Sequence, residues 1–377
     1  MSENLSEAAK AIGRYKRQAE QLLRDAAQCQ PAMRLGLMTT LYFKHGHCAS
    51  IRRQVDACFV QFYEAFRPLL KWQSYKRQRK LSPSSFSICR RQVLEAGTDE
   101  SVQWSLCGAA MGEAASHGLA LVGTSAGQAR ADQSCLKMLL PWSLLTEPGG
   151  IKVYEGWLKY LCNQTGAEHG YGGPVCVLPD KQPGCLPLEF RLAQEYPGLM
   201  VDAGAHMESL RLFERIKGVS WYTVLGARYV DRLGGNDRLR RTLSAHRDVI
   251  FQAYDHGLMI RAGALPDLGS KGEPSSSAYI AVNKVIKPIR VRDTGCLHPC
   301  PVRGTAFTEQ STAQWYARFD EKPVDAVRAG QPCPQSGHWF SNARARSRRF
   351  FSKGEVMPAF EHVKAERTQW FWAEVSG

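Results

Sequence analysis

The stretch Ile216–Gly235 reads IKGVSWYTVLGARYVDRLGG and carries the clearest local folding signal in the chain. Apolar residues recur in it at helical spacing, which predicts a helix over Trp221–Leu233. The residues expected on its buried face are Tyr222, Leu225, Tyr229, Val230 and Leu233. Glycine readily adopts the left-handed conformation that ends a helix, so Gly234 and Gly235 are expected to stop it. The stretch is therefore interpreted as scaffold that holds the loops on either side.

The residues that follow predict a second short helix and a hairpin. Asn236 can cap this helix, because an asparagine side chain accepts hydrogen bonds from the first backbone amides. Apolar runs over Asp248–Tyr254 and Leu258–Ala262 flank the turn around Asp255, which is a hairpin signal. Beyond the hairpin we expect a loop over Ala264–Ser276 and a helix over Ala278–Ile286.

The N-terminal part predicts a helix, a strand and another helix. Residues 1–30 are rich in helix formers and should form one helix that Pro31 ends. Alternating apolar residues predict a strand over Arg34–Phe43. Ser50 can then cap a helix with one apolar face. The residues of that face are Val55, Cys58, Phe59, Phe62, Tyr63 and Phe66.

The middle of the chain has weaker patterns. Short apolar runs predict strands around Trp104–Cys107, Leu119–Val122 and Leu136–Leu145. Helical spacing predicts helices over Val153–Cys162 and Leu188–Tyr196. Between them, Gly166–Pro187 is rich in glycine, proline and cysteine and predicts a long loop.

Together these elements predict an α+β fold, with a mixed or antiparallel sheet, helices packed on it and a small β-rich C-terminal unit. The domain boundaries that we expect are an N-terminal helix over 1–30, a main domain over 31–292 and a small aromatic-rich module over 311–377.

Composition limits the classes of function. The 377 residues carry a net charge of +14, which favours an acidic partner, such as nucleic acid or an acidic protein face. The N-terminus lacks a signal-peptide pattern, and no apolar run is long enough to span a membrane. Twelve cysteines are scattered along the chain and are expected to be reduced thiols. We therefore expect a cytoplasmic protein.

The sharpest enzymatic pattern is Gly123–Gly127, GTSAG, which matches the G-x-S-x-G nucleophile elbow with Ser125 as nucleophile. These letters resemble those of patatin-like acyl hydrolases, and Asp202-Ala203-Gly204 loosely resembles their Asp-Gly motif. The glycine-rich oxyanion loop of that family is missing upstream. A serine acyl hydrolase is therefore the alternative function, with a polar turn as the simpler interpretation.

Two groups of residues are candidates for metal binding. His45, His47 and Cys48 are metal ligands by residue type, but three neighbouring ligands do not easily reach one ion. Cys296 and Cys300, with His298 and the distant Cys333, form a second zinc candidate. We expect no metal and no cofactor.

Nucleic-acid binding is a further alternative. Lys71–Lys80 interleaves Trp72 and Tyr75 with five cations, which suits base stacking and phosphate contact. Ser341–Phe351 is also basic. A solvated surface is the more common role of such runs, so nucleic acid is not the expected partner.

The order of segments in the second half resembles that of a known family. Ile216–Gly235 is followed by the hairpin that ends in Leu258–Gly263, LMIRAG, and later by Tyr279–Arg290, YIAVNKVIKPIR. This order resembles the TsiV-like family of type VI secretion immunity proteins. The strand LGLMTTLYF and the helix containing IRRQVDACFVQFYEAF are similar to the opening of that family. The resemblance covers about residues 33–292 and makes 31–292 the immunity domain.

The tail is similar to a short module found on other toxin-immunity proteins. Its signature is Cys333–Trp339, CPQSGHW, followed by Gly354-Glu355, Met357-Pro358 and a closing aromatic strand over Thr368–Trp372.

The resemblance implies an immunity protein without catalytic residues. Its partner would be a cognate type VI effector toxin, a cytoplasm-acting nuclease, which it would neutralise by occluding the active or substrate-binding site. The charge leaves three alternatives open, because a basic inhibitor repels a basic nuclease. The effector is acidic overall, or a local acidic patch makes the contact, or the catalytic carboxylates of a metal-dependent nuclease meet basic residues of this protein.

Loops carry function more often than packed elements, so the partner-binding residues are expected in loops. The predicted set is Glu168 and Tyr171 in Gly166–Pro174, Asp255 at the hairpin tip, Asp267 in the following loop, and Asp202.

Overall fold

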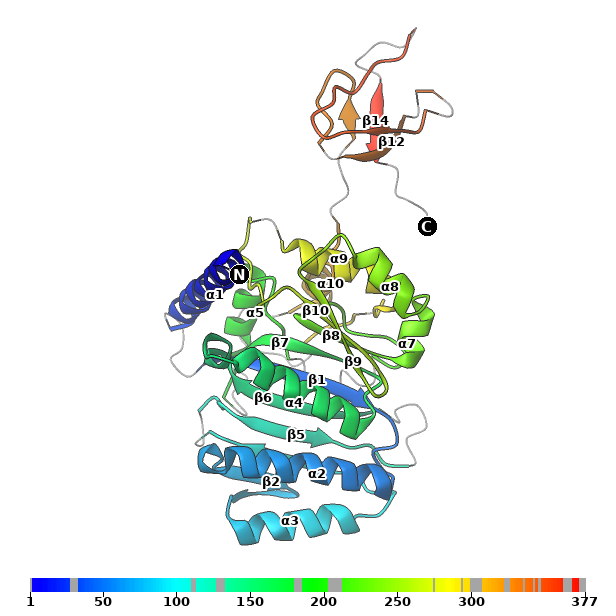
Figure 1. Ribbon diagram of the computed structural model, residues 1–377. Helices are drawn as coiled ribbons and strands as arrows, with labels where there is room; N and C mark the ends of the chain where they lie inside the picture. The colour runs from blue at the N-terminus through cyan, green and yellow to red at the C-terminus, as the bar shows by residue number, and fades with distance from the viewer. Residues whose placement is uncertain are drawn as a thin grey trace. The chain divides into compact units, whose positions relative to one another are not determined.

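An antiparallel sheet of ten strands runs through the larger part of the described chain (Figure 1). The computed structural model describes residues 2–27, 33–109, 113–126, 133–179, 185–202, 212–273, 275–292, 294–298, 307–321, 326–334, 336–341, 343–344, 347–361 and 368–372. The chain divides into two units, Met1–Asp320 and Glu321–Gly377, which are described separately. The predicted α+β class is confirmed.

The strand order in the larger unit is β3-β2-β4-β5-β6-β1-β7-β8-β10-β9, and neighbouring strands are antiparallel throughout. The strands are β1 (Arg34–Phe43), β2 (Trp72–Tyr75), β3 (Arg77–Lys80), β4 (Gln103–Cys107), β5 (Gly118–Val122), β6 (Ser134–Pro141), β7 (His169–Val177), β8 (Tyr222–Gly226), β9 (Val249–Tyr254) and β10 (Gly257–Ala262).

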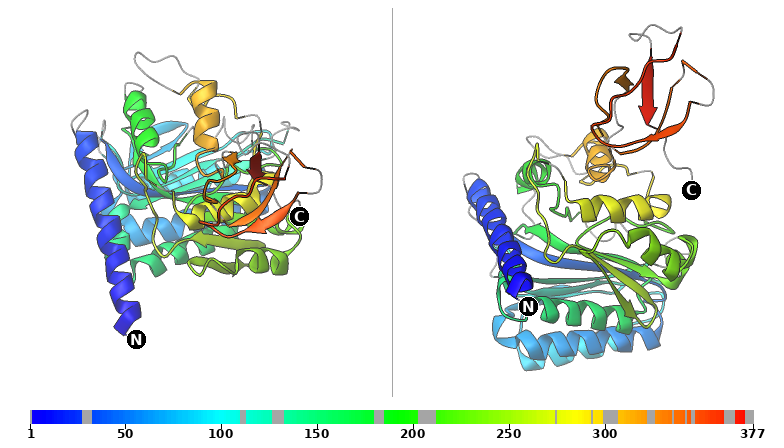
Figure 2. Two further views of the ribbon diagram at one scale, coloured as in Figure 1. Left: turned by 90° about the horizontal axis from the view of Figure 1, so that it is seen from above. Right: turned by 45° about the horizontal axis from the view of Figure 1, so that its top comes forward.

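Helices cover both faces of this sheet. The helices are α1 (Ser2–Ala27), α2 (Ala49–Phe66), α3 (Pro83–Glu95), α4 (Gly150–Thr165), α5 (Leu186–Glu195), α7 (Ala227–Arg232), α8 (Asn236–Leu243), α9 (Ser277–Ile286) and α10 (Glu309–Tyr316), with short 3-10 turns at Arg67–Leu69, Trp142–Thr146 and Lys287–Ile289. Figure 2 shows α5 and α10 on one side of the sheet and α2 and α4 on the other.

The central strand β1 separates two apolar cores. Leu37 and Leu41 pack into the core shared with α2 and α4, whereas Met38 and Tyr42 pack into the core shared with α5 and α10. Successive side chains of a strand point to opposite faces, so a strand covered on both sides is apolar almost throughout. The predicted strand over Arg34–Phe43 is confirmed with the same bounds.

The predicted helix over Trp221–Leu233 is wrong in its first half. Tyr222–Gly226 is the strand β8, paired with β7 and β10, and only Ala227–Arg232 is helical. All five residues of β8 are buried, because apolar side chains fill the cores on both faces of the sheet. The double-glycine stop is confirmed, since Gly234 and Gly235 have φ angles of 93° and 88°. The apolar residues predicted to be buried in this stretch are buried.

The predicted long loop over Gly166–Pro187 is also wrong, because His169–Val177 forms the central strand β7. Its glycines are needed because atoms of neighbouring elements lie too close to leave room for a side chain. A Cβ at Gly170 would lie 2.5 Å from the carbonyl oxygen of Thr40, and one at Gly172 would lie 2.5 Å from Oη of Tyr154. Tyr154 reaches from α4 to the sheet, where its hydroxyl lies 2.8 Å from Oγ1 of Thr39. The glycines of this segment are therefore explained by close packing within the sheet, and they do not indicate a loop.

Several other elements follow the prediction closely. The N-terminal helix, the strands β4 and β5, the hairpin of β9 and β10, and the helices α4, α5, α8 and α9 are confirmed. The strand predicted over Leu136–Leu145 is confirmed only as far as Pro141, because Trp142–Thr146 is a 3-10 turn. The helix α2 starts at Ala49 with Cys48 at its N-cap, so the predicted cap by Ser50 is wrong. Gly235 and not Asn236 occupies the N-cap of α8. No described helix is long and apolar enough to cross a membrane.

The basic run over Lys71–Lys80 forms a hairpin at the edge of the sheet. Strand β3 is the outermost strand and carries Arg77, Arg79 and Lys80, whereas Tyr75 of β2 is buried. The helix α3 follows and was not predicted. It begins with a capping box in which Ser82 and Ser85 bond reciprocally to each other's backbone amides.

The larger unit ends on a charged junction between α9 and the residues after α10. The carboxylate of Asp320 accepts two hydrogen bonds from Arg290, at 2.7 and 3.0 Å, and one from Asn283 at 2.8 Å. Burial by itself would raise the pKa of Asp320, but these hydrogen bonds and the charge of Arg290 lower it to about 2. Asp320 is therefore ionised at neutral pH and fixes the end of the unit to α9.

Asp320→Asn is expected to lower the free energy of unfolding at pH 7 by about 2 kcal/mol, because the largely buried Arg290 loses its charged partner. The folded pKa lies below the usual value of about 4, so the wild-type contribution is complete above about pH 4 and is lost as the pH falls toward 2. Urea denaturation from pH 7 to pH 2 measures both effects. The exposed Asp231→Asn serves as control, and equal losses in both variants would contradict the assignment.

The second unit is a small four-stranded sheet. Its order is β11-β14-β12-β13. The strands are β11 (Val327–Arg328), β12 (Gly337–Ser341), β13 (Arg349–Phe351) and β14 (Gln369–Trp372). Its core contains Cys333, Trp339, Phe351, Met357 and Trp370. The helix α10 belongs to the larger unit, although it lies within the module predicted over 311–377.

Candidate functional site

Five segments meet at one side of the large sheet, where several of its strands begin or end. Strand β1 ends beside the start of β7, β7 starts beside the end of β8, and β8 ends beside the start of β10. We call this region the loop edge. It consists of Lys44–Cys48, Gly166–Glu168, Leu212–Glu214, Gly226–Arg228 and Asp255-His256.

A network of ion pairs holds the loop edge together. Glu168 is the centre of this network, with Lys44 at 3.4 Å and Arg228 at 3.2 Å from its carboxylate oxygens. Arg228 also pairs with Glu214 at 3.2 Å and lies 5.0 Å from the ring centroid of Tyr229. The segments are therefore fixed to one another by charged side chains that remain accessible to solvent.

Phe213 is exposed beside this network. Its relative exposure is 44%, which is unusual for a phenylalanine beside a charged cluster. It lines a shallow depression together with Lys44, Glu168, Glu214 and Arg228. Residues that dominate protein–protein interfaces are commonly aromatic or arginine side chains surrounded by polar groups. This combination is what a tight protein contact requires.

A buried histidine supports the loop edge from inside. His169, the first residue of β7, hydrogen-bonds through Nε2 to the side-chain amide of Gln133 at 2.5 Å and stacks on Tyr42 at 4.6 Å. Burial, followed by the positive charge of Arg228, lowers the pKa of His169 to about 3. The imidazole is therefore neutral at physiological pH and acts as a rigid support for the ion pairs above it.

The structure brings two of the predicted site residues to the loop edge. Glu168 is the centre of the ion-pair network, and Asp255 is exposed at the tip of the β9–β10 hairpin. Both segments are hydrogen-bonded to the residues at the start of α7. The amide of Gly226 donates to the carbonyl of Glu168 at 2.7 Å, and the amide of Ala227 donates to the carbonyl of His256 at 2.8 Å.

The other three predicted residues lie elsewhere. Tyr171 lies inside β7 with 2% exposure, so the expected loop over Gly166–Pro174 is wrong from His169 onward. Asp202 forms an ion pair with Lys137 of β6. Asp267 accepts hydrogen bonds from Arg14 at 3.1 Å and from Gln18 at 3.0 Å, which attach α1 to the loop after β10.

Asp202 borders a second concave feature, a groove of about 880 Å³ over the β2–β6 part of the sheet. At its inner end, His298 lies 2.7 Å from a carboxylate oxygen of Glu189. Burial raises the pKa of Glu189, and the hydrogen bond from His298 partly opposes that rise. This pair connects α5 to the segment before α10.

Sequence reasoning missed four residues of the network, namely Lys44, Phe213, Glu214 and Arg228. Arg228 lies within the stretch Ile216–Gly235, but the predicted helix assigned that whole stretch to the scaffold. Phe213 and Glu214 stand just before it, in a segment without periodicity. An aromatic residue next to an acidic one in such a segment was the signal available.

The geometry around Ser125 differs from that of a nucleophile elbow. An elbow needs a strand that turns directly into a helix. Here residues 123–126 are not helical, and they leave β5 toward its antiparallel neighbour β6. Two backbone hydrogen bonds attach these residues to the segment before β4. The amide of Gly123 donates to the carbonyl of Val102 at 2.7 Å, and the amide of Ala126 donates to the carbonyl of Thr98 at 2.8 Å. Gly127 and Ala203-Gly204 lie outside the described residues.

The second zinc candidate is not assembled in the described part of the chain. Sγ of Cys296 donates a hydrogen bond to the carbonyl of Phe307 at 2.9 Å, and His298 is paired with Glu189. Cys300 lies outside the described residues, and Cys333 belongs to the core of the other unit.

Comparisons with known proteins agree with the fold. The chain is similar to a solved structure described as Pseudomonas aeruginosa T6SS protein PA0821, with a TM-score of 0.70, 25% sequence identity, and coverage of 77% of this chain and 83% of that chain. No curated protein sequence matches the chain. The family model TsiV, described as type VI immunity for VRR-NUC, matches residues 54–319. The chain therefore belongs to the TsiV family of type VI immunity proteins for VRR-NUC.

Proposed function

We propose that this protein binds a VRR-NUC nuclease effector of the type VI secretion system and blocks it by covering its active or substrate-binding site. The observation that carries the proposal is the loop edge, where the exposed Phe213 lies beside the ion pairs of Glu168, Arg228 and Glu214. An inhibitor of this kind needs a rigid complementary surface and no catalytic group.

The charge distribution supports the loop edge as the contact. The whole chain carries a net charge of +14, which by itself repels a basic, nucleic-acid-binding partner. At the loop edge, however, the carboxylates of Glu168 and Glu214 both lie next to Arg228, and Asp255 is exposed in the same region. A local acidic group of this kind can engage cations that otherwise bind nucleic-acid phosphates. This favours the acidic-patch alternative over an acidic effector.

The site of action is proposed to be the cytoplasm, where a nuclease meets its substrate. The ten described cysteines are all free thiols, and seven of them are buried, which suits a reducing compartment. Nucleic acid and membrane are not proposed as partners.

A nuclease inhibition assay tests this function. Equimolar protein is expected to form a 1:1 complex with its VRR-NUC effector and to stop DNA cleavage, while the protein alone cleaves nothing. A fluorophosphonate probe is expected to leave Ser125 unlabelled. A lack of complex formation at micromolar concentration, together with undiminished cleavage, would rule the proposal out.

A further inference from the structure

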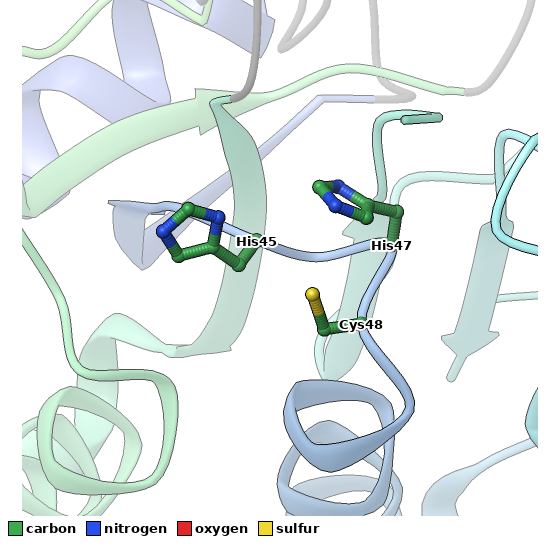
Figure 3. A group of neighbouring side chains, drawn as sticks. All are labelled: His45, His47 and Cys48. Atoms are coloured by element: carbon green, nitrogen blue, oxygen red, sulfur yellow. The ribbon is translucent and has the colours of Figure 1, made fainter. Parts of the chain in front are cut away.

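The turn between β1 and α2 places three metal-binding side chains next to one another (Figure 3). His45, His47 and Cys48 each offer one donor atom, and these atoms lie within 4.8 Å of one another. Tetrahedral zinc, with bonds of about 2.0 Å to nitrogen and about 2.3 Å to sulfur, separates such donors by about 3.4 to 3.6 Å. The remaining difference of about 1 Å is within the reach of side-chain rotation. The three side chains therefore converge, which their adjacency in sequence argued against.

The backbone explains how neighbouring residues converge. His45 has a φ of 61°, in the left-handed region, so the chain reverses direction at this residue. The amide of Cys48 then donates a hydrogen bond to the carbonyl of His45 at 2.8 Å, which closes the turn. This closed turn keeps the three side chains together and makes adjacent residues usable as ligands.

The turn is also fixed from both sides. Gly46 is buried against β6, where an added Cβ would lie 2.0 Å from Oγ of Ser134. Cys48 is the N-cap of α2, and its carbonyl accepts the first helical hydrogen bond, from Arg52 at 3.0 Å. The donor positions are therefore set by a strand on one side and a helix on the other, as a metal site requires.

From this geometry we propose that His45, His47 and Cys48 bind one Zn²⁺ ion, with an open fourth position. Imidazole and thiolate are ligands that zinc prefers, and hard cations such as Mg²⁺ and Ca²⁺ prefer oxygen. His45 is exposed and the other two residues are half-buried, so the ion enters from solvent and a water molecule completes the tetrahedron. The site does not depend on the effector and stands independently of the proposed function.

Cobalt titration of the reduced, metal-free full-length protein tests the site, since Co²⁺ replaces Zn²⁺ and its spectrum reports thiolate ligation. We expect one equivalent to bind with a sulfur-to-metal charge-transfer band, and Zn²⁺ to displace it. Cys48→Ser should abolish the band and weaken binding at least tenfold, and His47→Gln should weaken it to a similar extent. Circular dichroism checks that both variants remain folded.

Cys296→Ser is the matched control, because Cys296 is another half-buried thiol and belongs to the other zinc candidate. It should leave both the band and the stoichiometry unchanged. The proposal is overturned if Cys48→Ser keeps the band, if Cys296→Ser removes it, or if the wild-type protein binds no cobalt.

Discussion

Replacing Gly170 with Ala is expected to lower the free energy of unfolding by about 3 kcal/mol, at the upper end of the usual cost of overpacking a core. Gly170 lies in β7 directly opposite Leu41 of β1, and the two strands are hydrogen-bonded neighbours in the middle of the sheet. An added Cβ would lie 2.5 Å from the carbonyl oxygen of Thr40 and 2.8 Å from Cδ2 of Leu41. The carbonyl is backbone and cannot rotate away, so the strands themselves must separate.

Gly156→Ala is the matched control for this prediction. Gly156 lies inside the helix α4, and an added Cβ there would meet nothing within 4 Å. Alanine in a helix interior is more favourable than glycine by about 0.5 to 1 kcal/mol, so this variant should be slightly more stable than the wild type. Urea denaturation of the three proteins measures the difference. A Gly170→Ala variant as stable as the wild type would mean that β7 does not pack as described.

Phe213→Ala is expected to weaken binding to the VRR-NUC effector about 100-fold, which corresponds to about 2.7 kcal/mol. The side chain is exposed in the free protein, so its truncation leaves no cavity and the fold should be unaffected. The loss would instead come from the apolar contact that Phe213 makes beside the ion-pair network. Titration calorimetry with the effector measures the affinity, and thermal unfolding verifies the stability.

Phe350→Ala provides the comparison, because Phe350 is also an exposed phenylalanine, at 57%, and lies in β13 of the other unit. It should bind the effector as tightly as the wild type. If the Phe350 variant loses affinity and the Phe213 variant does not, the contact surface lies in the C-terminal unit and not at the loop edge.

The sequence predicted secondary structure best for elements that are buried on only one side. The face of α2 was predicted from its 3.6-residue period, since only one side of that helix meets the sheet, and five of its six residues are fully buried. The strand β1 is covered on both faces, but it was found because polar and small residues interrupt its apolar run. The hairpin of β9 and β10 was found because its turn residues are distinctive.

The sequence failed for β7 and β8, two further strands that are covered on both faces. In β8 every side chain is buried, so the period of two disappears, and spacing alone does not separate a strand from a helix. In β7 the glycines resemble those of a loop, but Gly170 is needed because the backbone of β1 lies close to it, and Gly172 because Tyr154 of a distant helix does. Such a cause lies in tertiary packing and is invisible to a local pattern.

The candidate site was predicted only in part for a related reason. Glu168 and Asp255 were chosen because they stand in connecting segments, and the structure brings both to the loop edge. Arg228 gains its importance from Glu168 and Glu214, which are distant in sequence and pair with it only after the strands have paired. Phe213 gains its importance from lying beside these pairs.

The basic outer strand β3 also affects how the protein behaves when it is abundant. An edge strand presents unpaired backbone groups, to which another copy can add its own edge. Two copies joined through β3 would bring Arg77, Arg79 and Lys80 of one molecule against the same cations of the other. Like charges on facing strands oppose such pairing. At high concentration this immunity protein is therefore expected to resist self-association at this edge.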